Sequence, residues 1–165
     1  MMITLTGFMG SGKTTVGKVL ADFLGCPFMD RDDLVVKKAG KSIPDIFAQD
    51  GEPAFRELEA QVLRKTVAKY AESTAVLALG GGAVLAPASA ALLHEKTVCI
   101  YLRATLETLL ARLAGETAGR PLADDALAER LASREPIYEK TAHVIIDTDG
   151  LSPDEVADEI IISAL

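Results

Sequence analysis

The sequence predicts an α/β fold in which helices cover both faces of a five-stranded parallel sheet. Two observations lead to this prediction: five short apolar runs occur along the chain, and helical segments separate each run from the next. Runs that are apolar at nearly every position suit strands buried on both faces, which are typical of parallel sheets. The alternation of strand and helix predicts crossover connections that cover the sheet on both sides.

The five apolar runs give the positions of the strands: 2–6, 26–29, 74–79, 97–102 and 144–146. The segments between them have apolar residues at helical spacing, or begin at a capping residue or proline. These segments predict helices at 16–24, 34–36, 42–49, 54–71, 87–93 and 105–113, then one that follows the break at 115–125 and ends at about 138, and one from 153 onward. Gly51, Glu52 and Pro53 are expected to break the chain between two of them. Ser152, Pro153 and Glu155 predict the N-terminal cap of the last helix.

The first predicted strand is followed by the pattern Gly-x-x-x-x-Gly-Lys-Thr over residues 7–14. Glycines let successive backbone N–H groups turn toward phosphate oxygens at a helix N-terminus. In this frame Lys13 reaches the β- and γ-phosphates of a nucleotide, and the Thr14 hydroxyl ligates Mg²⁺. An incidental glycine-rich turn is disfavoured because the preceding strand and the following helix agree with the motif. The residues expected to bind a nucleotide here are Gly10, Ser11, Gly12, Lys13, Thr14 and Thr15.

Length and composition favour one soluble domain spanning residues 1–165. The chain is 49% hydrophobic and 25% charged, and no apolar run approaches the roughly 20 residues of a membrane span. The first strand begins almost at once, without a signal segment, so a cytoplasmic location is the default expectation. A net charge of −7 argues against nucleic acid as the main partner. We expect neither a nucleic-acid nor a membrane partner, and a monomer.

Cysteines and histidines are not expected to carry the chemistry. Cys26 and Cys99 are too few for a disulfide framework and are expected to be buried thiols. His94 and His143 are isolated in the sequence, which favours surface or packing roles over catalysis or metal binding.

Other nucleotide-binding classes fit the sequence less well than a small kinase. A GTPase reads guanine with an Asn-Lys-x-Asp motif, but the chain contains no asparagine. The Asp-Thr-Asp-Gly sequence at 147–150 resembles a GTPase motif but lies near the C-terminus, so we interpret it as a turn. A motor-type ATPase would usually have a mid-chain strand that ends in an acid, whereas the strand at 74–79 ends in glycine.

Three unusual segments follow the first three predicted strands. They are the glycine-rich loop, the acidic segment Asp30-Arg31-Asp32 and the triple glycine Gly80-Gly81-Gly82. Ligands bind beyond the carboxyl ends of the strands in open α/β sheets. The three segments therefore predict a single site.

These motifs together resemble the shikimate kinase family over the whole chain. The matching features are the loop 7–14, Phe28-Met29-Asp30-Arg31-Asp32, Asp50-Gly51-Glu52 with Phe55-Arg56, Gly80-Gly81-Gly82, Arg120-Pro121-Leu122 and Arg134-Glu135-Pro136-Ile137-Tyr138. The resemblance implies a P-loop three-layer α/β/α sandwich of the nucleoside-monophosphate-kinase type. It also implies ATP as cofactor, Mg²⁺ as metal and shikimate as substrate, with a substrate-binding segment at about 31–60.

The resemblance also implies roles for individual residues. Asp30 supports the metal, and Asp32 binds and activates the substrate hydroxyl. These two acids could instead cap the next helix, a task that Asp33 is also placed to perform. Arg56 and Arg134 bind the substrate carboxylate, although each could be a surface arginine paired with Glu52, Glu59 or Glu135. In the triple glycine, Gly81 lies against a substrate hydroxyl, with Gly80 and Gly82 beside it.

Further implied residues contact the nucleotide. Arg120 lies in a small, polar segment at about 114–125 that is expected to be a lid, and it contacts the phosphates. Arg112 matches a family position near the adenine. The family often has a basic or amide residue in the loop after the last strand, whereas this chain has Asp149-Gly150-Leu151-Ser152. Neither the chemistry nor the resemblance assigns a role to Arg31.

The predicted reaction is transfer of the γ-phosphoryl group of MgATP to the 3-hydroxyl of shikimate, which gives shikimate 3-phosphate and ADP. This would be a step toward chorismate and the aromatic amino acids. The nearest alternative is a kinase for gluconate or another small hydroxy acid. A nucleoside monophosphate kinase and a regulatory module that binds nucleotide without catalysis are further alternatives.

Overall fold

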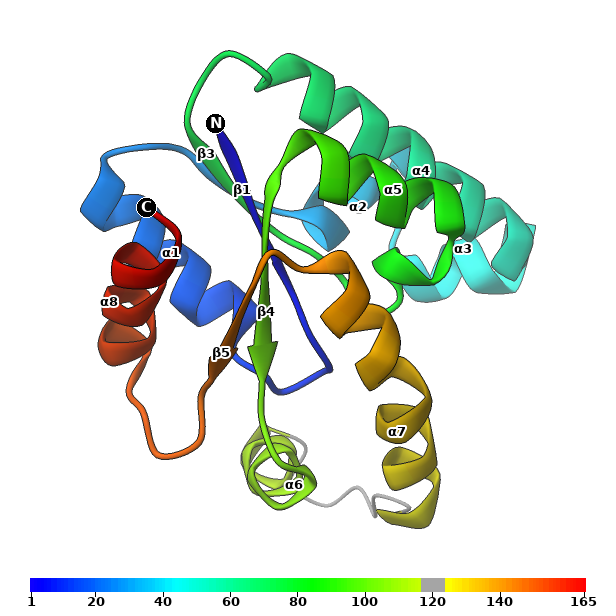
Figure 1. Ribbon diagram of the computed structural model, residues 1–165. Helices are drawn as coiled ribbons and strands as arrows, with labels where there is room; N and C mark the ends of the chain where they lie inside the picture. The colour runs from blue at the N-terminus through cyan, green and yellow to red at the C-terminus, as the bar shows by residue number, and fades with distance from the viewer. Residues whose placement is uncertain (117–123) are drawn as a thin grey trace.

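The computed structural model describes residues 1–116 and 124–165 and contains a five-stranded parallel sheet (Figure 1). Its strands are β1 (Met2–Thr6), β2 (Phe28–Asp30), β3 (Ala75–Ala78), β4 (Val98–Arg103) and β5 (Val144–Asp147). They lie in the order β2-β3-β1-β4-β5, and every neighbouring pair is parallel. The predicted fold class is therefore confirmed. β2 begins later than predicted because Pro27 has no amide hydrogen for the ladder, although its carbonyl accepts from the Val76 N–H.

Eight α-helices and one 3₁₀ helix are described between and after these strands. The helices are α1 (Lys13–Leu24), α2 (Arg31–Ala39), α3 (Ile43–Asp50), α4 (Glu52–Lys69), η1 (Ala83–Leu85), α5 (Pro87–Lys96), α6 (Leu106–Glu116), α7 (Asp124–Thr141) and α8 (Pro153–Ala164). The predicted capping box of α8 is confirmed, with Ser152 and Glu155 each bonding the other's backbone N–H. The expected break is at Gly51 alone, since Glu52 and Pro53 already lie in the first turn of α4.

Two apolar clusters hold helices against opposite faces of the sheet. Ile3 and Leu5 of β1 pack with Leu20 of α1 and Ile160 of α8. On the other face, buried side chains of β3 and β4 pack against α4, α5 and α7. Figure 1 shows α1 and α8 on one side of the sheet and α4, α5 and α7 on the other. The three-layer arrangement leaves the carboxyl ends of the strands as the edge where loops gather.

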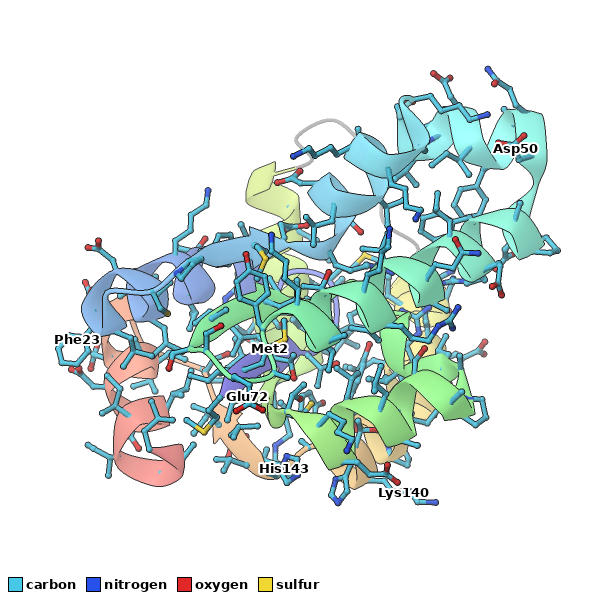
Figure 2. All side chains as sticks on the ribbon, turned by 90° about the horizontal axis from the view of Figure 1, so that it is seen from above. Met2, Phe23, Asp50, Glu72, Lys140 and His143 are labelled. Carbon is cyan, nitrogen blue, oxygen red and sulfur yellow. The ribbon has the colours of Figure 1, made fainter. Side chains whose placement is uncertain are left out.

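Helices α2, α3 and the start of α4 form an arm with a small core of its own. Val35, Ile46, Phe55 and Val62 are buried together there. Asp50 lies at the outer end of this arm, far from the sheet (Figure 2). The arm begins where β2 ends at Asp30. Side chains from the start of α4 therefore lie near the carboxyl end of β2.

One prediction about the cysteines needs correction. Cys99 is buried as predicted, but Cys26 is only partly buried because it lies in the turn between α1 and β2. The packing role expected of His94 and His143 is confirmed: their rings stack with centroids 4.4 Å apart, and the Cys99 N–H donates to Nδ1 of His143. Among the helices that the structure describes, none is long and apolar enough to cross a membrane.

Candidate active site

The glycine-rich loop joins β1 to α1 and curls around its own lysine. Gly10 and Gly12 have φ values of 82° and 93°, a region that disfavours other residues. Lys13 Nζ donates to the carbonyl of Gly7 at 2.7 Å and to that of Phe8 at 3.0 Å. α1 begins at Lys13, so its free N–H groups face the loop. This is the local geometry of a phosphate-binding loop.

Lys13 sits in an unusual electrostatic environment. Loss of hydration lowers its pKa to about 8, although the carboxylates of Asp32 and Asp30 act in the opposite direction. The ammonium is therefore mostly charged at neutral pH, and carbonyls hold it in place. No carboxylate of the described residues forms an ion pair with it, so a ligand with phosphate oxygens would supply a direct opposite charge.

A cavity of about 220 Å³ opens beside the loop and brings together five residues that the sequence predicts to bind the nucleotide. These are Gly10, Ser11, Gly12, Thr15 and Arg112. Residues after β5 and from the start of α8 complete the cavity: Thr148, Leu151, Pro153 and Val156. The cavity thus combines a phosphate-binding end with a more apolar end, as a nucleotide requires.

Arg112 and Asp149 fix the walls of this cavity. The Arg112 guanidinium donates to the carbonyls of Gly10 and Thr148, each at 3.2 Å, so it links the loop to the chain after β5. Asp149 accepts from the N–H of Thr105 at 3.1 Å and from its hydroxyl at 2.8 Å. The side chain of Asp149 is thus a tether to the chain just before α6.

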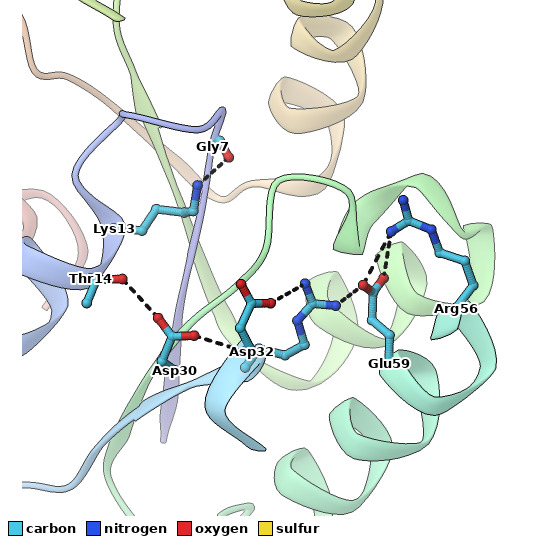
Figure 3. Close-up of polar contacts among 8 residues, drawn as sticks. Gly7, Lys13, Thr14, Asp30, Asp32, Arg56 and Glu59 are labelled. Atoms are coloured by element: carbon cyan, nitrogen blue, oxygen red, sulfur yellow. Dashed lines mark hydrogen bonds and ion pairs between the residues drawn. The ribbon is translucent and has the colours of Figure 1, made fainter. Parts of the chain in front are cut away.

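Asp30 connects the end of β2 to the phosphate loop. Its Oδ2 accepts a hydrogen bond from the Thr14 hydroxyl at 2.9 Å, and its Oδ1 accepts one from the Asp32 N–H at 2.8 Å (Figure 3). The second bond makes Asp30 the N-cap of α2. The cap is therefore Asp30 and not Asp33, and the same carboxylate also faces a predicted metal ligand.

Asp32 lies in the first turn of α2 with its side chain 52% exposed. Its Oδ1 is 3.1 Å from Nη2 of Arg31. Partial burial raises the pKa of Asp32, an effect that Arg31 opposes and that Asp30 and Glu59 strengthen. Asp32 is thus a carboxylate that is open on one side and charge-paired on the other.

Arg56 projects from the first turns of α4 and is anchored by Glu59. Its Nη1 lies 3.3 Å from Glu59 Oε2, and its Nε lies 3.6 Å from Glu52. The sequence allowed such pairs for a surface arginine. However, the Glu59 side chain is only 7% exposed, and it also pairs with Arg31 (Figure 3). Glu59 is therefore part of the site, where a buried carboxylate holds two arginines.

The triple glycine makes room for three guanidinium groups. A methyl group placed on Gly80 would lie 1.7 Å from Arg31 Nη2, and one on Gly82 would lie 2.8 Å from Arg56 Nη1. One on Gly81 would lie 3.3 Å from Arg134 Nη1. Any side chain here would displace these arginines. Arginines from α2, α4 and α7 therefore converge on one glycine segment.

Arg134 reaches this point from α7. Its guanidinium carbon lies 5.7 Å from the centroid of the Phe8 ring in the phosphate loop. Tyr138, one turn later, donates from its hydroxyl to the Gly81 carbonyl at 2.6 Å. Among the described side chains, no carboxylate forms an ion pair with Arg134. Arg134 is thus a cation available to an anionic ligand.

The predicted lid and its phosphate contact fall largely outside the described residues. Arg120 and Pro121 lie within residues 117–123, so the role predicted for Arg120 stays a prediction. The remaining predicted residues gather at the carboxyl ends of β1, β2 and β3, as the sequence led us to expect.

Sequence reasoning missed two members of this site. Glu59 was considered only as a surface partner of Arg56, and Arg31 had no role. A signal for Glu59 was present, since residues at i and i+3 share a helix face and Arg56 is assigned to the ligand. For Arg31 the sequence carried no such signal, because its partner Glu59 lies on another helix.

Comparison with known proteins agrees with this geometry. A family model described as "Shikimate kinase" matches residues 9–164. The shikimate kinase of Enterococcus faecalis is 43% identical over 164 residues, which cover 96% of this chain and 95% of that protein. The enzyme of Geobacter sulfurreducens is 45% identical, covering 96% and 87%.

Solved structures give the same result. A shikimate kinase from Acinetobacter baumannii in complex with shikimate superposes with a TM-score of 0.86 at 35% identity, covering 97% of this chain and 90% of that one. A gluconokinase from Sinorhizobium meliloti 1021 superposes with a TM-score of 0.66 at 20% identity, covering 98% and 89%. The second likeness shows a shared fold and no more.

Proposed function

The chain belongs to the shikimate kinase family, and we propose that it transfers the γ-phosphoryl group of ATP, with Mg²⁺, to the 3-hydroxyl of shikimate. The products are shikimate 3-phosphate and ADP, in the route to chorismate and the aromatic amino acids. The family itself implies ATP as the phosphoryl donor. The observation that carries the choice of acceptor is the convergence of arginines on Gly80, Gly81 and Gly82 beside the phosphate loop.

An acceptor that carries a carboxylate suits these arginines. A guanidinium group can offer two parallel N–H donors to a carboxylate. We assign the carboxylate of shikimate to Arg134 and Arg56, and a ring hydroxyl to the backbone of Gly81, within a binding segment at about 31–60. The Tyr138 hydroxyl already donates to the Gly81 carbonyl, so we assign this contact to the Gly81 N–H.

The donor nucleotide is assigned to the cavity beside the phosphate loop. Lys13 offsets the charge of the β- and γ-phosphates, and the loop N–H groups bind their oxygens. The buried hydroxyl of Ser11 has no hydrogen-bond partner among the described residues, which is expected of a group whose partner is a ligand. Arg112 and the chain after β5 contact the base, and Arg120 contacts the phosphates.

The oxygen donors present fit a magnesium ion. Thr14 Oγ1 and Asp30 Oδ2 lie 2.9 Å apart at the start of α1. No group of three His, Cys, Asp or Glu side chains occurs among the described residues, so phosphate oxygens and water would complete the coordination. When bound, Mg²⁺ neutralises charge on the phosphates. Thr14 and Asp30 are the residues that would hold the ion, Thr14 through its hydroxyl and Asp30 through its carboxylate.

Asp32 is the proposed catalytic acceptor of the hydroxyl proton. Its exposed side faces outward from α2, and its raised pKa brings it closer to a proton acceptor's ideal range. Phosphoryl transfer demands mainly alignment and charge stabilisation. Asp32 therefore both orients the 3-hydroxyl and takes its proton, while Lys13 stabilises the transferred group.

ADP release from MgATP tests this proposal, with shikimate, gluconate or a nucleoside monophosphate as acceptor and a blank without acceptor. We expect release with shikimate alone. Release with gluconate instead would favour the alternative function as a gluconate kinase. No release above the blank would favour a regulatory module that binds nucleotide without catalysis. Asp32→Ala should lose nearly all turnover while ATP binding, measured by calorimetry, is kept. Unchanged turnover would remove Asp32 from the mechanism.

We further propose that the enzyme works as a monomer in the cytoplasm, without nucleic-acid or membrane partners. The two free cysteines support a reducing compartment. Sedimentation at micromolar concentration tests the oligomeric state: a species near 17.5 kDa supports a monomer, and one of twice that mass contradicts it.

A further inference from the structure

Arg31 is the most deeply buried of the arginines around the triple glycine. Its side chain is 3% exposed, although arginine is rarely buried unless it is paired. It opens α2 directly after the N-cap Asp30. Burying a guanidinium is costly unless hydrogen bonds or opposite charges compensate it. The residues that pair with Arg31 therefore indicate its role.

The two partners of Arg31 belong to the two halves of the acceptor site. One arm of the guanidinium, Nη2, lies 3.1 Å from Oδ1 of Asp32. The other arm, Nη1, pairs with Glu59, whose Oε2 lies 3.3 Å from Arg56 Nη1. Figure 3 shows this continuous chain of contacts from Asp32 to Arg56. Arg31 therefore connects the proposed catalytic carboxylate to a proposed ligand of the substrate carboxylate.

Gly80 determines the position of this guanidinium. A methyl group on Gly80 would lie 1.7 Å from Nη2 and 2.9 Å from the guanidinium carbon of Arg31. The face of Phe55 lies on another side, with its centroid 5.9 Å from that carbon. The guanidinium thus has one place to lie, and that place depends on the absence of a side chain at position 80.

We propose that Arg31 is a positioning residue for the acceptor, which holds Asp32 and the Glu59–Arg56 pair at a fixed separation. This inference rests on the function proposed above. Without Arg31, Asp32 is free to turn into solvent because half of it is exposed. Glu59 then keeps only its contact with Arg56, so nothing fixes the separation between Asp32 and the Glu59–Arg56 pair. The planar fork gives each acid its own nitrogen arm, whereas lysine has one nitrogen in place of two.

Steady-state kinetics of Arg31→Met test the proposal, since methionine keeps much of the length and removes the fork. We expect kcat to fall at least tenfold and the KM for shikimate to rise at least tenfold, with the KM for ATP within twofold of the wild type. Arg64→Met is the matched control, because Arg64 also pairs with a glutamate, Glu57, but is 57% exposed. It should leave all three constants unchanged.

Arg31→Lys keeps the buried positive charge. It is the variant to measure if Arg31→Met fails to fold. We expect it to remain impaired in both kcat and the KM for shikimate, because lysine reaches only one of the two acids. Wild-type values for a folded variant at position 31 would overturn the proposal, as would a loss confined to the KM for ATP. A wild-type protein that does not phosphorylate shikimate would refute the proposed function and this inference with it, whereas an active wild type with an unaffected variant at position 31 would refute the inference alone.

A double-mutant cycle tests the contact between Arg31 and Gly80. Gly80→Ala should lower the melting temperature and the activity of the wild type, because the new methyl group displaces the guanidinium. In an Arg31→Ser background the space is free, so Gly80→Ala should cause no further loss. Equal losses in both backgrounds would show that Gly80 does not act through Arg31.

Discussion

Asp30 has two separate tasks in the structure, and two substitutions separate them. Its Oδ1 caps α2, while its Oδ2 accepts from the Thr14 hydroxyl. Replacing a capping aspartate with alanine costs about 0.5–2 kcal/mol, whereas asparagine caps nearly as well. Losing the negative charge at the helix N-terminus costs a further 0.3–1 kcal/mol, roughly. We therefore expect unfolding free energies lower by about 1–3 kcal/mol for Asp30→Ala and by less than about 1 kcal/mol for Asp30→Asn.

The activity of these variants should depend on the negative charge at position 30 and not on whether the residue caps α2. If Asp30 orients Mg²⁺ through water, both variants should need about 10–100-fold more Mg²⁺ for half-maximal turnover, the usual effect of losing such a group. Urea unfolding measures the first quantity, and turnover across a magnesium titration measures the second.

Ile160→Val is the control for destabilisation. Ile160 is fully buried between α8 and the sheet and belongs to neither proposed binding region. The substitution should cost about 0.5–1.5 kcal/mol, similar to the cap, without changing the magnesium requirement. If Asp30→Asn showed the wild-type magnesium requirement and turnover, Asp30 would be a helix cap only, and the metal assignment would be refuted.

Three other predictions follow from single contacts. Arg134→Ala should raise the KM for shikimate by about 30-fold or more, as for a lost partner worth about 2–5 kcal/mol; a change confined to ATP would move Arg134 to the nucleotide site. Gly17→Ala should destabilise the protein by about 1–3 kcal/mol in thermal unfolding despite the better helix propensity of alanine, because its methyl group would lie 2.5 Å from the Phe28 ring. A thiol reagent at pH 8 should label Cys26 and not Cys99 until denaturant is added, because burial raises the pKa of Cys99 to about 11; rapid labelling of both thiols in the native protein would contradict its burial.

The sequence predicted the strands, the phosphate loop and their meeting at one edge because these depend on local patterns. Apolar runs and glycine spacing are properties of neighbouring residues. It did not predict the strand order, which depends on how distant segments pair. It also gave no means of deciding that Asp30 and not Asp33 caps α2, since both are acidic residues at the start of one helix and only the backbone path selects between them.

The side-chain pairs between elements were the part that sequence reasoning could not supply. His94 and His143 stack although 49 positions separate them in the chain. Arg31 and Glu59 pair across α2 and α4, and neither has a local pattern that names the other. The triple glycine was predicted to bring backbone close to a ligand, but the structure gives a further reason, since arginine side chains occupy the space beside it.

The two arginines proposed to bind the substrate carboxylate differ in their ion pairing. Arg56 is already paired with Glu52 and Glu59, so a substrate carboxylate that binds it exchanges one ion pair for another. Arg134 has no such partner among the described side chains and lies against an aromatic ring, so an incoming carboxylate supplies its first opposite charge. In a chain of net charge −7, this unpaired cation is what makes the site locally attractive to an anion. We therefore expect the affinity for the acceptor to come mainly from Arg134, and we expect Arg56, held by Glu59, mainly to fix the acceptor's orientation toward Asp32.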